Sequence, residues 1–220
     1  YKRQILYDWS IHMSEIIEFT MSDLSFPVVI NKYHLINHAQ MFDMHQHRAI
    51  FQIFLVEKGS IRFLSHAQEF ILSPNQFLVI NCGDFHYGET VTHESVLVSY
   101  KFNLEAITQS GLFHSESKNL LALQNGMLRI ADQIDSTYIH SLLIDLLNEC
   151  QEHRIGYELN AFGGALNILA ALIRDHQSYS LLTPSSPTYQ QAEKVKTIIN
   201  YIKENYPYHI CLLYTSDAAD

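Results

Sequence analysis

The chain has 220 residues, of which 47% are hydrophobic and 17% charged, and its formal net charge at pH 7 is −9. These values are typical of a globular protein of one or two domains and exclude an intrinsically disordered chain. The negative charge opposes contact between the chain as a whole and a phosphate backbone. No apolar run approaches the roughly 18 residues that a transmembrane helix requires, and no charged-then-apolar leader is present, so we expect neither a membrane span nor secretion.

The three cysteines, Cys82, Cys150 and Cys211, are odd in number and widely separated. This pattern fits neither a disulfide framework nor a zinc site made of paired cysteines. We therefore expect reduced thiols and a cytoplasmic location.

Short apolar runs at close intervals fill residues 26–103, after an N-terminal arm that we assign to residues 1–25. Gly59, Ser73-Pro74-Asn75 and Gly83-Asp84 separate several of these runs and provide the residues that tight antiparallel connections need. Many short strands with tight turns predict a β-sandwich or barrel.

Three histidines lie at the edges of two of these runs. His45 and His47 are two residues apart at the head of one run, so on a strand they point to the same face, and His86 ends another run. If the two runs face each other in a barrel, the three imidazoles converge on a ligand site, a metal site or both. Gln52 is five residues beyond His47 and faces away from the histidines unless the strand bends or bulges between them.

The apolar period changes after about residue 104. Two stretches repeat at helical spacing, and we expect both to form amphipathic helices in a helical region spanning residues 104–180. Gly156 lies between them and suits the turn of a helical hairpin. Their apolar stripes form either a dimer seam or a packing face against the barrel. The stripes are Ile139, Leu143, Leu146 and Cys150, followed by Leu159, Phe162, Leu166, Leu169 and Ile173.

Beyond this region we expect a linker at residues 181–190, which is rich in proline and small polar residues. A helix follows at residues 191–209, and Pro207 ends it. Residues 211–220 contain no basic side chain.

The histidine pattern resembles the motifs of the cupins, which are small double-stranded β-barrels. Their first motif is His-x-His, four residues, an acid, six residues and glycine, and this chain has His45, His47, Gln52 and Gly59 at that spacing. Their second motif ends in Gly-x-x-His, which here is Gly83 to His86, without the usual preceding proline. The resemblance covers roughly residues 26–103. Gln52 replaces the carboxylate that usually helps to bind a metal.

The whole layout is similar to that of bacterial transcription regulators of the AraC type. The resemblance implies a mainly β fold with C-terminal α-helices: a cupin barrel, a helical hairpin and a linker to a partial helix-turn-helix segment. It implies an effector in the barrel, a homodimer through the helices of residues 132–176, and DNA binding through a C-terminal domain of which only the first helix, residues 191–209, is present. DNA-binding residues therefore stay unknown. The tail 211–220 resembles translated sequencing-adaptor DNA, and we interpret it as non-native.

The interpretation that follows is an effector-binding and dimerising part of a transcription regulator, with no catalytic role and no required cofactor. The effector is expected to be a small polar, carbohydrate-like molecule bound by His45, His47, Gln52, His86 and Tyr87. Phe51, Phe54 and Phe77 are either pocket residues or plain core. One alternative is a metal-dependent cupin enzyme, a dioxygenase or sugar isomerase, with a divalent metal on His45, His47 and His86. Another is a pure dimerisation module whose pocket binds nothing.

Overall fold

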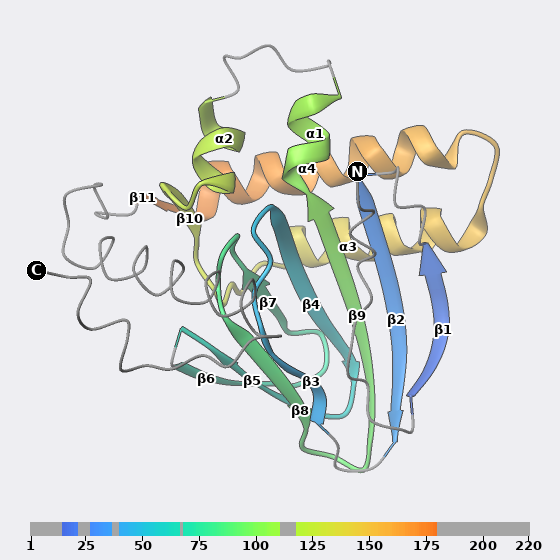
Figure 1. The fold of residues 1–220 in the computed structure, drawn as a ribbon. Coiled ribbons are helices and arrows are strands. Elements are labelled where there is room, and N and C mark those ends of the chain that lie inside the picture. The colour runs from blue at the N-terminus through green and yellow to red at the C-terminus, as the bar shows by residue number, and fades with distance from the viewer. Residues whose placement is uncertain (1–14, 22–26, 37–39, 67, 111–117, 180–220) are drawn as a thin grey trace, which may run out of the picture. The chain divides into compact units, whose positions relative to one another are not determined.

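The computed structural model describes residues 15–21, 27–36, 40–66, 68–110 and 118–179 (Figure 1). The chain divides into two units, residues 1–179 and residues 180–220, and all described residues belong to the first. The expected linker at 181–190, the expected helix at 191–209 and the tail at 211–220 therefore lie outside the described residues.

Two antiparallel sheets make up the β region, as the sequence predicts. The five-stranded sheet has the order β1 (Glu15–Met21), β2 (Val28–Ile36), β9 (Glu94–Asn103), β4 (Ile50–Lys58) and β7 (Phe77–Ile80). The four-stranded sheet has the order β3 (Gln40–His45), β8 (His86–Thr90), β5 (Ile61–Ser65) and β6 (Gln68–Leu72).

The turn between β4 and β5 needs a glycine. Gly59 has a φ of +75°, and a Cβ atom there would lie 2.3 Å from the carbonyl oxygen of Glu94. Only a residue without a side chain fits this backbone conformation and this close approach. The predicted turn therefore needs glycine at position 59, because a side chain there would clash with the neighbouring backbone.

Residues 15–21 lie within the expected N-terminal arm. They form β1, which pairs with β2 at the edge of the five-stranded sheet, and the pairing is irregular between Ile17 and Phe19. The segment is rich in β-branched and aromatic residues, which favour strands.

Strand β4 of the five-stranded sheet is buried on both faces. One face of β4 presents Phe54 and Val56 to the space between the two sheets, where they form a core with residues of the four-stranded sheet. The other face presents Phe51, Ile53 and Leu55 to a second core, which is shared with the helices. This double burial explains why the sequence of β4 is almost continuously apolar instead of alternating.

The helices follow β9 directly. They are α1 (Leu104–Gln109), α2 (Lys118–Gln124), α3 (Thr137–Glu152) and α4 (Tyr157–His176). Two short strands, β10 (Leu128–Ile130) and β11 (Gln177–Tyr179), pair with each other on either side of the hairpin of α3 and α4. The sequence prediction of a helical hairpin is confirmed, whereas the β10–β11 pair was missed because three-residue strands leave no periodic pattern.

The hairpin of α3 and α4 lies across the outer face of the five-stranded sheet (Figure 1). Leu143 on α3 is fully buried there, and the hydroxyl of Tyr100 on β9 donates a hydrogen bond to the Leu143 carbonyl oxygen at 3.0 Å. The predicted stripe of α3 is thus a packing face against the barrel.

The apolar residues predicted to form the stripe of α4 are not the ones that pack most closely against the rest of the described chain. Leu159 is 79% exposed, whereas Ala161, Ala165 and Leu172 are buried. Small residues allow α4 to approach its neighbours closely, so the buried face contains alanines that a search for large apolar residues does not select. Of the predicted stripe, Leu159 stays exposed and Phe162, Leu166 and Ile173 stay half-buried, whereas Leu169 is buried.

Cys82 and Cys150 are buried and form no disulfide, as expected, and burial raises the pKa of Cys82 to about 12 and that of Cys150 to about 11. Cys211 lies outside the described residues. Among the helices that the structure describes, none has the length and apolar character that crossing a membrane requires.

The packing of the hairpin of α3 and α4 predicts that two of its leucines contribute differently to the free energy of unfolding. Leu143→Ala creates a cavity against the sheet and should lower the free energy of unfolding by about 2–5 kcal/mol. Leu159→Ala removes a mostly exposed side chain and should change it by less than about 0.5 kcal/mol. Urea unfolding measures both values, and equal losses would contradict the described packing.

Candidate functional site

The histidines of the two predicted motifs lie together. His45 ends β3, His86 begins β8, and the two residues are partners in the antiparallel pairing of these strands. Their ring centroids are 4.3 Å apart, and the centroid of His47 is 4.8 Å from that of His45 and 5.5 Å from that of His86. One nitrogen from each ring lies within 4.8 Å of the other two. The three imidazoles therefore converge as the motif spacing predicts.

Backbone carbonyl groups fix the tautomers of two of these histidines. Nδ1 of His45 is 2.7 Å from the Asp43 carbonyl oxygen, and Nδ1 of His86 is 3.0 Å from the Asp84 carbonyl oxygen. A carbonyl oxygen only accepts hydrogen bonds, so both Nδ1 atoms carry a proton, and Nε2 of the neutral His86 ring holds a lone pair. The Nε2 atoms of His45 and His47 are 3.2 Å apart.

Burial keeps two of the rings neutral at physiological pH. It lowers the pKa of His47 to about 3, with further lowering by the charges of Lys101, His45 and His86. It also lowers the pKa of His86 to about 4, with a smaller contribution from His45. The Nε2 atom of His86 is buried and has no hydrogen-bond partner among the described residues. A lone pair inside the barrel is thus left for a ligand to use.

Gln52 reaches the same interior from the other sheet. The chain leaves β3 at His45 and enters β4 at Ile50, so it passes from the four-stranded to the five-stranded sheet between the histidines and Gln52. This break is the one that the five-residue spacing requires. The Gln52 amide nitrogen donates to Oγ of Ser99 at 2.9 Å, while its amide oxygen is buried without a partner in the described chain.

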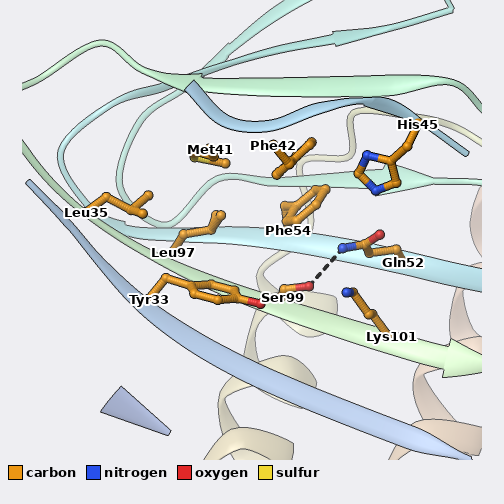
Figure 2. A pocket seen from close by; sticks show the side chains of 10 residues that line it. All are labelled: Tyr33, Leu35, Met41, Phe42, His45, Gln52, Phe54, Leu97, Ser99 and Lys101. Carbon is orange, nitrogen blue, oxygen red and sulfur yellow. Dashed lines mark hydrogen bonds between the residues drawn. The ribbon is translucent and has the colours of Figure 1, made fainter. Parts of the chain in front are cut away.

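A cavity of about 30 Å³ lies between the sheets beside these groups. A single water requires about 10–15 Å³ by this kind of measure, so the space is larger than one water needs. Figure 2 shows polar groups at one end and apolar side chains at the other. The lining residues are Tyr33, Leu35, Met41, Phe42, His45, Gln52, Phe54, Leu97, Ser99 and Lys101.

The predicted site residues are only partly among those that line the cavity. His45, Gln52 and Phe54 line it, and His47 and His86 contact His45. Tyr87 follows His86 on β8 and therefore points to the opposite face, where its hydroxyl donates to Glu89 at 2.8 Å. The structure does not bring Tyr87 to the cavity.

Phe51 and Phe77 pack in the core that β4 and β7 share with the helices, and so they also lie away from the cavity. Sequence reasoning missed Ser99 and Lys101, which line the cavity from β9. The available signal is their spacing, since two polar residues at i and i+2 in the apolar run "VLVSYKF" lie on one face of a strand.

A buried ion pair holds the turn that carries His86. The Asp84 carboxylate is 2% exposed and accepts hydrogen bonds from both terminal nitrogens of Arg129, at 2.8 Å each. Burial alone raises the pKa of Asp84, but hydrogen bonds from His66 and Arg129 outweigh it and lower that pKa. Because the Asp84 carbonyl also accepts from His86, the orientation of the ring depends on this pair.

The neutral histidines predict a loss of stability in mild acid for the metal-free protein. The unfolded chain binds protons at His47 and His86 below pH 6.5, whereas the native state binds them only near pH 3–4. The free energy of unfolding should therefore fall as pH falls from 6.5 to 4.5, by up to about 1.4 kcal/mol per unit for each histidine. Urea unfolding in a chelating buffer measures this slope.

The double variant His47→Gln/His86→Gln should have a shallower slope over the same range. His93→Gln, which changes an exposed histidine, is the matched control and should keep the slope of the wild type. Identical slopes in the double variant and the control would show that the two buried histidines do not stay neutral.

The sequence matches the family model of the AraC-like ligand binding domain over residues 29–182. A search of curated proteins found no match. Three solved structures illustrate its structural likenesses. KdgF from Halomonas sp. has 18% identity and a TM-score of 0.34, over 35% of this chain and 69% of that chain. The Cnp3 cupin domain of Schizosaccharomyces pombe has 9% identity and a TM-score of 0.38, over 42% and 63%.

An HTH_3 family transcriptional regulator from Vibrio cholerae has 16% identity and a TM-score of 0.35, over 40% of this chain and 50% of that chain. The chain thus spans less than two thirds of the Cnp3 and Vibrio cholerae structures. The assignment depends on the family match, which covers more than half of the chain. This protein belongs to the family of AraC-like ligand binding domains.

Proposed function

We propose that the barrel and its helices form the sensing part of an AraC-type transcription regulator in the cytoplasm, and that a small polar effector binds in the cavity between the sheets. The effector is bound by His45 and Gln52 directly, with His47 and His86 behind them. The observation that carries this proposal is the Gln52 amide oxygen, a buried polar atom of a cavity-lining residue that has no partner among the described residues. A buried polar atom without a partner costs about 1–3 kcal/mol, which a ligand that hydrogen-bonds to it recovers.

The polar end of the cavity suits a molecule with hydroxyl groups, such as the carbohydrate-like effector that the sequence predicts. The Gln52 oxygen and the histidine lone pairs accept hydrogen bonds, and the Ser99 hydroxyl both donates and accepts. Effector binding alters the regulator only as far as the effector binds one arrangement of the protein more tightly than another. DNA binding belongs to a C-terminal domain that begins with the expected helix at 191–209.

A thermal-shift screen of sugars and small polar acids tests the effector site. An effector present at 100 times its Kd stabilises the native state by about 2.7 kcal/mol, which is a Tm rise of about 5 °C or more for a domain of this size. The wild type and the control His93→Ala should show this rise, and His45→Ala/His86→Ala should not. A compound that stabilises all three proteins equally would place the binding site elsewhere.

A divalent metal on the three histidines is the second candidate, and it would favour the metal-dependent enzyme. The donor set fits, because one nitrogen from each of three imidazoles lies within 4.8 Å of the other two, and Nε2 of His86 holds a lone pair. Gln52 would add a carbonyl oxygen. A metal there would polarise a bound substrate. Stoichiometric metal in the purified protein of the screen above, lost on His47→Ala, would support this candidate over the metal-free sensor.

Dimerisation is the remaining part of the proposal, through the helices of residues 132–176. The face of α4 that begins at Leu159 supports it, because Leu159 is exposed and Phe162 and Leu166, at helical spacing, are only half-buried.

We expect Leu159→Glu to convert a dimer into a monomer, because an interface does not accommodate an unpaired carboxylate. Light scattering coupled to size-exclusion chromatography measures the mass. Glu158→Gln, on the neighbouring exposed position, is the control and should stay dimeric. A wild-type protein that is monomeric at all concentrations would contradict this part of the proposal.

A further inference from the structure

The cavity lining contains a lysine and no carboxylate. Of its ten residues, Lys101 is the lysine, and none is aspartate or glutamate. This contrasts with the chain as a whole, which has 23 acidic and 14 basic residues. A carboxylate is a ligand group to which a lysine ammonium donates strong, charge-assisted hydrogen bonds.

Lys101 lies at the polar end of the cavity because of strand register. It is the β9 partner of Gln52 on β4, so the two side chains lie side by side on the same face of the sheet. Figure 2 shows the Lys101 ammonium group at the same end as Gln52, Ser99 and His45. The charge of Lys101 also contributes to the lowered pKa values of His47 and His86, which places its field inside the site.

The opposite end of the cavity is apolar. The rings of Phe42 and Phe54 are stacked with centroids 5.6 Å apart, and Leu35, Met41 and Leu97 continue this surface (Figure 2). A neutral sugar has hydroxyl groups around its whole ring, and those facing this end would lose their hydrogen bonds to water without replacement. A molecule with one polar end and an apolar body matches the lining better.

We propose that the effector is a small organic acid, with its carboxylate bound to Lys101 and its apolar body against Phe42 and Phe54. This inference depends on the proposed function, because it takes the cavity as the effector site. The Gln52 and Ser99 side chains contribute hydrogen bonds to the polar end of the ligand, and Lys101 determines the preference for an acid over its neutral analogue. An ammonium–carboxylate hydrogen bond is about twice as strong as a neutral one.

Matched pairs of acids and amides test this preference on the full chain. The probes are butyrate with butyramide and benzoate with benzamide, and arabinose serves as a neutral sugar. Calorimetry at fixed ionic strength should give at least one acid a Kd about tenfold or more below that of its amide. Lys101→Met should remove this difference by weakening acid binding while leaving the amide unchanged.

Two control variants complete the experiment. Lys118→Met removes an exposed lysine on α2 and should keep the preference, and Lys101→Arg keeps the charge and should keep most of it. Unfolding curves check that Lys101→Met folds. If it does not fold, the ratio of the acid Kd to the amide Kd is compared between Lys101→Arg and the wild type instead. No preference for either acid in the wild type, or an unchanged preference in a folded Lys101→Met, would overturn the inference.

The failure of this inference is distinguishable from that of the proposed function. Arabinose binding that is lost in His45→Ala/His86→Ala, without acid preference, would retain the effector site and overturn the acid class. Acid binding that is unchanged in both His45→Ala/His86→Ala and Lys101→Met would remove the cavity as the site and overturn both.

Discussion

The burial of β9 and β4 on both faces is the constraint on which the rest of the structure depends. The outer face of the five-stranded sheet packs against α3 and α4, and its inner face closes the cavity. A strand in this position accepts a polar side chain only where that side chain has a partner or where a ligand provides one. Tyr100 meets the requirement on the outer face through its bond to the Leu143 carbonyl. Gln52 and Ser99 meet it only in part on the inner face, since the Gln52 amide oxygen keeps no partner among the described residues.

The pairing of β3 with β8 adds the second half of the site. It sets His45 opposite His86, and the turn before β8 is held from outside the barrel by the Asp84–Arg129 pair. Arg129 belongs to β10, which pairs with β11 at the end of the described chain. One residue, Asp84, thus contacts a histidine of the site through its carbonyl group and the helical region through its carboxylate. A buried carboxylate is tolerated here because both of its oxygens accept hydrogen bonds.

Several features of the site follow from motif spacing, whereas others required the folded chain. The convergence of His45, His47 and His86 could be predicted, because alternation along a strand and the two cupin-like motifs place them on one interior. The predicted place of Tyr87 in the pocket did not follow from the same spacing. Its neighbour His86 points inward, and side chains alternate between the two faces of a strand, so Tyr87 points away from the cavity. Lys101 was missed because a single lysine in a strand is usually a solvated side chain. Only the β4–β9 register shows that this one lies beside Gln52.

By itself, the sequence determined the elements and their order: a strand-rich region that ends at residue 103, a helical hairpin that turns at Gly156, and three histidines on one face. These depend on local periodicity and turn chemistry, which a short window of sequence contains. Only the tertiary structure decided which face of α4 packs against the sheet, that Arg129 binds Asp84 across 45 residues, and what lines the cavity. Those outcomes depend on contacts between segments far apart in the chain, which local patterns do not specify because many alternative pairings satisfy the same periodicity.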